Sequence, residues 1–112
     1  MPEAAHAYFR ITGDQENTKK ILEKYGKDPT YEIRVLEIIY QLKADGEFML
    51  DFLKERLEKG EVSSQEIVLD ALFEIGPKAK SSANAVRRVS NSHEDPLIRY
   101  RAKQVLESVF RD

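Results

Sequence analysis

The side chains that could hold a metal ion or transfer a proton are few in this sequence and far apart. It contains two histidines, His6 and His93, and no cysteine. Neither histidine has a second ligand at the spacing of a metal motif such as H-E-x-x-H. His93 lies in a polar segment just before Asp95-Pro96, where we expect a solvated loop residue. The sequence therefore predicts neither a metal site nor a cofactor.

Nucleophiles and carboxylates form no catalytic motif. The serine pairs Ser63-Ser64 and Ser81-Ser82 have no G-x-S-x-G turn and no histidine placed to activate them, so we expect them to cap or pack helices. The carboxylates fall on polar helix faces, whereas acid–base catalysis needs one in an apolar cleft. The five glycines stand singly and form no phosphate-binding loop. We expect a protein that is not an enzyme.

Charge is unevenly distributed along the chain. Residues 76–112 carry eight Lys/Arg and four Asp/Glu, a net charge of about +4, and the preceding residues carry about −6. A basic surface of this kind could bind phosphates. The helix expected at 47–59 carries four acidic side chains that would repel a duplex. Nucleic-acid binding is therefore an alternative, and an acidic protein surface is the favoured partner of the basic region.

The elements that would position these side chains follow from a repeat. The run that begins at Asp28-Pro29 returns at Asp95-Pro96 with a constant offset of about 67 residues, and a third copy around Val68 lies about 33 residues after the first. Self-similarity at this period is typical of stacked helical hairpins. Apolar side chains recur on two faces of residues 29–43, which predicts a helix packed between neighbours.

Turn and capping residues set the expected boundaries. Proline suits the first helical position, and glycine commonly follows the last one. We expect Asp28 and Asp95 to cap the helices that follow them, Ser63 or Ser64 to cap a third, and Gly76-Pro77 to separate two helices. The expected helices are residues 15–25, 29–43, 47–59, 63–75, 78–91 and 96–110, with a further short helix at 3–11.

The phrase from Ala71 to Ala79, followed by Asp95-Pro96 and the run from Arg101 to Leu106, resembles HEAT repeats, in particular the bacterial variety named for phycobilisome lyases. This resemblance implies an all-α chain that forms a short right-handed α-solenoid of five or six helices in antiparallel hairpins. One domain, residues 1–112, would contain repeats at about 1–26, 28–60, 61–92 and 94–112. Helices 29–43, 63–75 and 96–110 would form the outer layer, and helices 15–25, 47–59 and 78–91 the inner, concave one.

The resemblance also implies a ladder of Asp–Arg contacts between successive repeats. Asp28, Arg34, Asp95 and Arg101 occupy the matching positions. The middle repeat departs from the pattern, since Ser63 and Ile67 stand near the Asp and Arg positions. We therefore expect apolar contacts to hold the middle interface together.

The favoured function is a non-enzymatic protein-binding module or scaffold that uses its inner face. The predicted partner-binding residues are Lys19, Glu23, Leu50, Asp51, Lys54, Glu58, Asn84, Arg87 and Arg88. The resemblance leaves one alternative, a lyase-like or chaperone-like role on a tetrapyrrole-binding protein. Phe110 with Val105, Leu106 and Val109 predicts an uncovered apolar flank at the C-terminal end, where the chain could self-associate. The start of the chain resembles no secretory signal and no run is long enough to span a bilayer, so we expect a cytoplasmic protein with no membrane contact.

Overall fold

The computed structural model describes residues 2–109, and every regular element in that range is a helix. The elements are α1 (Pro2–Thr12), α2 (Gln15–Gly26), α3 (Glu32–Leu42), the 3₁₀-helix η1 (Lys43–Met49), α4 (Leu50–Lys59), α5 (Val62–Ile75), the 3₁₀-helix η2 (Gly76–Ser82), α6 (Ala83–Ser92) and α7 (Pro96–Ser108). The all-α prediction is confirmed. Within residues 2–109 there are seven α-helices rather than five or six, because the N-terminal segment forms the full helix α1.

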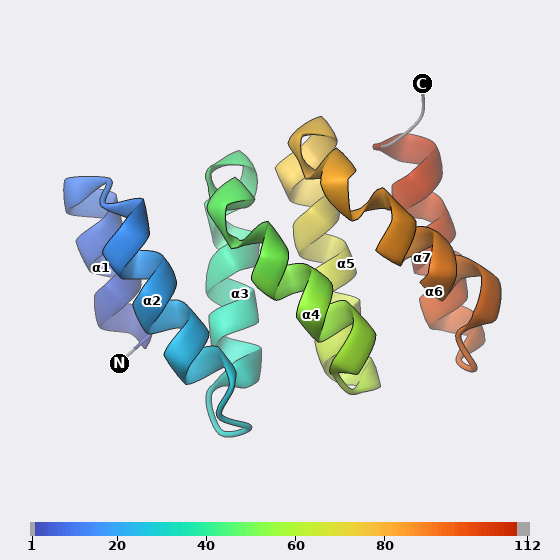
Figure 1. The fold of residues 1–112 in the computed structure, drawn as a ribbon, viewed down its shortest axis with the longest axis horizontal. Coiled ribbons are helices and arrows are strands. Elements are labelled where there is room, and N and C mark those ends of the chain that lie inside the picture. Colours follow the sequence, from blue (N-terminus) through green and yellow to red (C-terminus); the bar gives the residue numbers. More distant parts are fainter. Residues whose placement is uncertain (1, 110–112) are drawn as a thin grey trace.

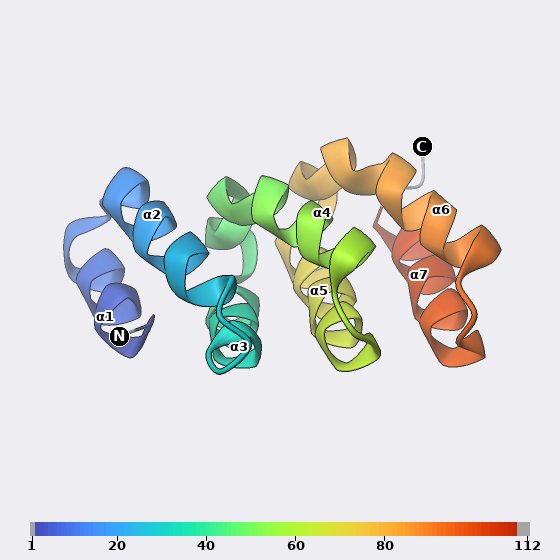
Figure 2. The same cartoon turned by 60° about the horizontal axis from the view of Figure 1, so that its bottom comes forward.

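The helices lie in two layers. Helices α1, α3, α5 and α7 form one layer, and α2, α4 and α6 form the other, so that the chain alternates between layers as it proceeds (Figures 1 and 2). Helix α5 packs against α3, α4 and α7. Helices α1 and α7 lie at opposite ends of the longest axis (Figure 1), and the Cα atoms extend over 38 × 31 × 16 Å.

The core lies between the layers and is centred on α3 and α5. Val35, Leu36, Ile38 and Ile39 of α3 are all fully buried, as the two apolar faces of this segment predict. Leu69 of α5 is 1% exposed and continues this core. The inward side chains of α6 are smaller, mainly alanine and valine, so this helix buries less apolar area than α3.

Two Asp-Pro sequences that look alike have different local structures. Asp95 caps α7 as predicted: its carboxylate accepts hydrogen bonds from the backbone N–H groups of Leu97 (2.8 Å) and Ile98 (3.4 Å). Asp28 accepts from the N–H of Thr30 instead, and α3 begins only at Glu32, so the helix predicted from residue 29 begins three residues later. Residues 28–31 form a turn, in which the Asp28 carbonyl accepts from the N–H of Tyr31.

Short 3₁₀ segments replace two predicted helix starts. The helix predicted over 47–59 begins as η1 and becomes α-helical at Leu50, and the one predicted over 78–91 begins as η2. Gly76 has a φ of 81°, which glycine adopts without steric cost, so its role as a helix stop is confirmed. Capping by Ser63 or Ser64 is wrong, because α5 begins at Val62 and has no side-chain cap.

Several aromatic side chains lie on the surface. Tyr8, Tyr40, Phe73 and Tyr100 are each about 40–60% exposed. They belong to α1, α3, α5 and α7, which form a single layer. No α-helix among residues 2–109 is both long and apolar enough to cross a membrane.

Candidate partner-binding face

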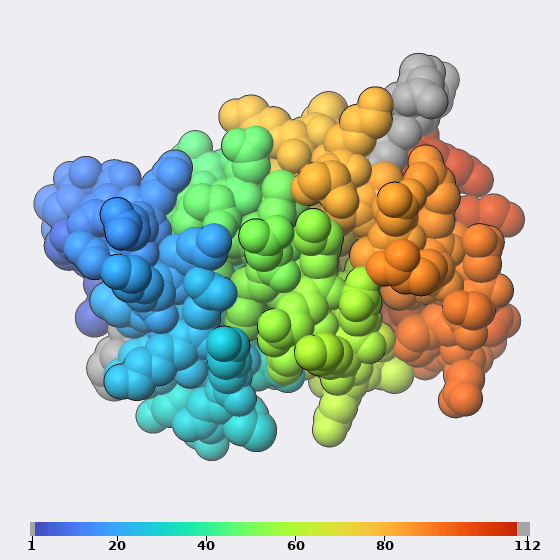
Figure 3. Space-filling view, in the orientation of Figure 1, coloured from blue at the N-terminus to red at the C-terminus, as the bar shows by residue number. Residues whose placement is uncertain are grey.

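The residues predicted to bind a partner belong to α2, α4 and α6, the layer that faces the viewer in Figure 3. We call the surface of this layer the α2–α4–α6 face. Five of the nine predicted residues are exposed: Asp51, Glu58, Asn84, Arg87 and Arg88. Lys19, Glu23 and Lys54 are half-buried. The face is therefore mainly polar and carries both signs of charge.

Leu50 must be removed from this set. Its side chain is 9% exposed and belongs to the hydrophobic core. The side chain of Leu50 is buried because the 3₁₀ segment η1 passes into α4 at this residue, and this position of the new helix faces the core. Leu50 is the first α-helical residue, and it is buried together with Met49 before it and Phe52 and Leu53 after it. Leu50 was predicted to bind a partner from the inner face, whereas it completes the buried side of α4.

A groove runs between α4 and α6 on this face. Its volume is about 240 Å³, and Leu57, Ala85 and Val89 provide apolar wall. At its rim Arg88 of α6 donates to Glu58 of α4 over 2.6 Å, and the two side chains are 64% and 47% exposed. Two of the predicted binding residues thus neutralise each other across the groove. The other lining residues, Gln65, Ser92 and His93, are polar too, so the groove presents a mixed surface.

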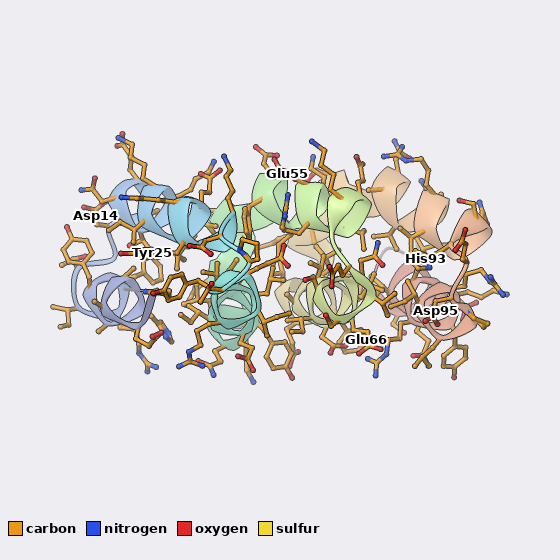
Figure 4. The ribbon with its side chains drawn as sticks, turned by 90° about the horizontal axis from the view of Figure 1, so that it is seen from below. Asp14, Tyr25, Glu55, Glu66, His93 and Asp95 are labelled. Atoms are coloured by element: carbon orange, nitrogen blue, oxygen red, sulfur yellow. The ribbon has the colours of Figure 1, made fainter. Side chains whose placement is uncertain are left out.

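Buried polar groups form the end of this groove. Gln65, which is 6% exposed, donates from Nε2 to the carbonyl of Leu57 (2.8 Å) and contacts His93 Nε2 through Oε1 (2.7 Å). His93 Nδ1 accepts from the backbone N–H of Asp95 (3.0 Å). Because Nδ1 is an acceptor, the proton of the neutral ring lies on Nε2 and is donated to Gln65. His93 lies between the two layers (Figure 4), so its interpretation as a solvated loop residue is wrong.

A second polar cluster joins α3, α4 and α5. Arg56 donates to Glu32 over 2.8 Å, both side chains are only 16% exposed, and Ser64 donates to the other oxygen of Glu32. Arg56 also contacts Glu55, and its guanidinium lies 6.0 Å from the ring centre of Phe52. Burial alone would raise the pKa of Glu32, but the hydrogen bonds from Ser64 and Arg56 and the positive charge of Arg56 outweigh it, and the pKa is lowered. Glu32 is therefore held as a carboxylate.

The predicted ladder between repeats has its arginines in place but uses different acids. Arg34 of α3 contacts Glu3 of α1 over 3.4 Å, and Arg101 of α7 contacts Asp70 of α5 over 2.9 Å. Asp28 and Asp95 instead accept hydrogen bonds from N–H groups in their own turns. Each carboxylate is occupied locally because it lies beside the free N–H groups that follow it.

The middle junction also differs from the expectation. The sequence predicts that apolar contacts alone hold it together, and Ile67 does pack partly buried against the core. The contacts of Glu32 with Arg56 and Ser64 add a polar link there.

At the C-terminal junction, burial raises the pKa of Asp70, although the charge of Arg101 opposes this shift.

Glu32 and Gln65 could have been found from the sequence. They lie 33 residues apart at the same position of two successive repeats, each at the start of a strongly apolar helix. A polar side chain on a face that neighbouring helices cover must find a partner, since its unsatisfied burial costs free energy. A polar residue that recurs at the same repeat position on a covered helix face is therefore a sequence signal for a buried polar contact. The identity of the partners requires the angle at which α4 and α6 cross the other layer.

Another cavity is separate from the α4–α6 groove. It has a volume of about 480 Å³ and is lined by α1, the start of α2, the end of α3 and η1. His6 lies in its wall, where burial first, and then the charges of Arg10 and Arg34, lower the pKa of the imidazole. Within residues 2–109 no three His, Cys, Asp or Glu side chains are grouped so that they could hold a metal ion.

The predicted C-terminal flank is only partly described. Val105 is 3% exposed, and Leu106 and Val109 pack half-buried against the core, so these three side chains do not form an open apolar surface. Phe110, the centre of that prediction, lies outside the described residues.

Comparison with known proteins gives no identity, because no family model, no curated protein and no solved structure matches the chain.

Proposed function

We propose that the chain is a short right-handed α-solenoid of the HEAT type, and that it acts as a non-enzymatic module that binds a protein through its α2–α4–α6 face. Contacts that recur at similar separations support the solenoid. Arg34 and Glu3 are 31 residues apart, Arg101 and Asp70 are 31 apart, and Arg88 and Glu58 are 30 apart. Such regularity is expected when each hairpin contacts the next in the same way.

The observation that carries the binding role is the groove between α4 and α6. Its wall combines Leu57, Ala85 and Val89 with polar side chains, it has a rim of opposite charges, and a part-buried Gln65–His93 contact lies at its end. The exposed side chains Asp51 of α4 and Asn84 and Arg87 of α6, which belong to the same face, have side-chain hydrogen bonds and ion pairs only within their own helix among the described residues. They are free to meet a partner without disturbing the core.

Nucleic-acid binding has less support than protein binding. Arg88 is already paired with Glu58, and Asp51 on the same face adds negative charge. A duplex would have to break the first contact and tolerate the second. No contact among the described residues favours the tetrapyrrole-related alternative.

The test is affinity capture from the native lysate with three immobilised proteins, followed by mass spectrometry. The first is the wild-type chain, and the second carries Asp51→Lys and Arg87→Glu on the α2–α4–α6 face. The third carries Arg10→Glu and Glu107→Lys on the opposite layer, which leaves the net charge equally unchanged. A partner retained by the first and third proteins and lost by the second supports the proposal. Equal retention by all three, or loss only with the third, overturns it.

A further inference from the structure

The four ion pairs that join different helices within residues 2–109 share one direction. They are Glu3–Arg34, Glu32–Arg56, Glu58–Arg88 and Asp70–Arg101. In each pair the acid lies on the earlier helix and the arginine on the later one. Glu32–Arg56 lies within the predicted repeat 28–60, and the other three pairs join successive predicted repeats. Each ion pair between repeats therefore has its acid on the earlier repeat and its arginine on the later one, on the side that faces the earlier repeat, which we call the leading side.

The side of an odd-numbered helix that faces the next repeat is acidic or neutral in α3 and α5, and the corresponding side is basic in α7. The positions of Glu32 and Leu36 in α3 are occupied by Gln65 and Leu69 in α5, 33 residues on, and both leucines are buried by the helices that follow. In α7, the positions that correspond to Glu32 and Leu36, 67 residues further on, are occupied by Arg99 and Lys103. Lys103 is exposed, and Arg99 donates to the carbonyl of His93 over 2.6 Å. We call Arg99, Lys103 and the half-buried Leu106 the C-terminal face.

The leading side of the first hairpin is apolar and carries a cation. A cavity of about 380 Å³ lies there, lined by Ala4, Ala5 and Tyr8 of α1 and by Ile21, Lys24 and Tyr25 of α2. We call these six residues the N-terminal face. Tyr25 lies between the two layers at this end of the molecule (Figure 4). Lys24 is exposed and makes no ion pair with any residue of the described range.

Most of this face is turned away from the rest of the molecule. Its inner border is formed by Ala5, which is 2% exposed, and by Tyr25, whose ring meets that of Tyr31 edge-on. Glu3 points to α3, where it contacts Arg34, and Ala4 and Tyr8 lie about 100° and 140° around α1 from it. On α2, the side that meets α4 is marked by Gly26, where an added Cβ would come within 2.3 Å of the Phe52 ring. Ile21 and Lys24 lie on the opposite flank of that helix. The N-terminal face is thus the leading side of a junction whose earlier half is not occupied by this range of residues.

We infer that the N-terminal face binds an amphipathic helix of a partner protein, one that presents a leucine to the cavity and a carboxylate to Lys24. Continuity with the internal contacts supports this assignment, since the three ion pairs between successive predicted repeats each join an acid on the earlier repeat to an arginine on the later one. A second copy of the chain does not fit, because its C-terminal face would bring Arg99 and Lys103 toward Lys24. Like charges placed together suppress such pairing, so the C-terminal face acts against head-to-tail stacking of copies.

The experiment uses the chain itself as the probe helix. Arg99→Glu with Lys103→Leu gives α7 the same two residue types that α3 carries at positions 32 and 36. Sedimentation velocity over a range of concentrations measures self-association. We expect the wild type to remain monomeric and the double variant to form head-to-tail oligomers, with association at least about tenfold tighter than that of the wild type. Ala4→Arg, added on the N-terminal face, must return the double variant to the monomer.

Two further variants keep the result interpretable. Arg99→Glu removes a contact to the loop before α7, so Lys103→Leu alone, which leaves that contact intact, must show a smaller shift in the same direction. Lys78→Leu with Arg87→Glu makes the same kinds of change at exposed positions away from both ends and must stay monomeric. Failure of the folded double variant and of Lys103→Leu to associate overturns the inference. A wild-type dimer that Ala4→Arg dissociates would also overturn it, by showing that a second copy occupies the N-terminal face.

Discussion

The junction at the centre of the molecule and the junction at its N-terminal end use the same chemistry in different surroundings. At the centre, Glu32 and Arg56 are each 16% exposed, and Ser64 donates to the same carboxylate. At the N-terminal end, Arg34 and Glu3 are 47% and 48% exposed and lie 3.4 Å apart. Water screens the second pair on most sides, whereas protein surrounds the first.

The difference shows that contact geometry alone does not measure the strength of a junction. An exposed pair gains little, because water solvates both charges equally well when they separate. A buried pair has already lost that solvation, so the removal of one partner leaves the other uncompensated. Arg56 is the more vulnerable side here, because its Nε is buried without a hydrogen-bond partner even in the intact structure.

The largest expected effect follows from Glu32→Ala. This change leaves Arg56 buried beside Phe52 and takes the acceptor from Ser64, and it should lower the free energy of unfolding by about 3 kcal/mol. Urea denaturation followed by circular dichroism at neutral pH measures it. Glu55→Ala is the matched control: it removes the other, 39% exposed partner of the same arginine and should cost less than about 1 kcal/mol. Equal losses would mean that burial does not distinguish the two contacts.

The same carboxylate predicts a pH dependence. The pKa of Glu32 is lowered in the folded state, so the ionised side chain contributes stability at neutral pH, and this contribution is lost as the pH falls through the folded pKa. Glu32→Gln should therefore be less stable than the wild type at neutral pH, and the gap should narrow as the pH falls below the ordinary glutamate value of 4.5 and through the lower folded pKa. A gap that stays constant into the acid range would contradict a charge-based role.

The next effect tests the polar contact at the end of the groove. Gln65→Leu removes the bonds to the Leu57 carbonyl and to His93 and should cost about 1–3 kcal/mol, because both partners are left unpaired in a buried site. His93→Ala deletes only one of these bonds and should cost less. The double variant measures their coupling, and additive losses would indicate that the two side chains act independently.

A smaller loss is expected at the N-terminal junction. An arginine whose acceptor is buried contributes about 1–3 kcal/mol. Since Glu3 is half exposed, Arg34→Ala should lower the free energy of unfolding by less than about 1 kcal/mol. Arg101→Ala is the comparison, because its 2.9 Å contact with Asp70 is shorter and slightly more buried. An Arg34 loss as large as that of Glu32→Ala would contradict the difference between the two regions.

The sequence predicted what depends on local chemistry. The apolar positions of α3, the cap at Asp95 and the stop at Gly76 each follow from side chains within one turn, and all three are confirmed. Errors occurred where a residue meets a distant one. Asp28 and Asp95 each precede a proline, yet only α7 begins directly after the aspartate. The turn at 28–31 delays the start of α3, and in this turn Tyr31 contacts Tyr25 of α2.

The candidate face was predicted less well than the helices for the same reason. The exposed charges on α4 and α6 follow from helical periodicity, whereas the burial of Leu50 depends on how η1 turns into α4. His93 was assigned to solvent because its neighbours in sequence are polar. Its partner Gln65 lies 28 residues away, and only the crossing of α6 over α5 and α7 brings the two together.

The smallest expected effect concerns His6 at the N-terminal end. Burial and the charges of Arg10 and Arg34 lower the pKa of the ring, so the folded state favours neutral imidazole. The folded chain then binds fewer protons than the unfolded one, and stability falls as the pH drops below the ordinary histidine value of about 6.5. Thermal melts of His6→Gln should show a weaker decline between pH 7 and 5 than those of the wild type. Since Arg34 contributes to the shift, Arg34→Ala should also flatten that decline, while Glu55→Ala in the central cluster should leave it unchanged. A steeper decline in His6→Gln would show that protonation of this ring favours the folded state, and the N-terminal junction would then owe stability to a contact of His6 rather than to the exposed Glu3–Arg34 pair.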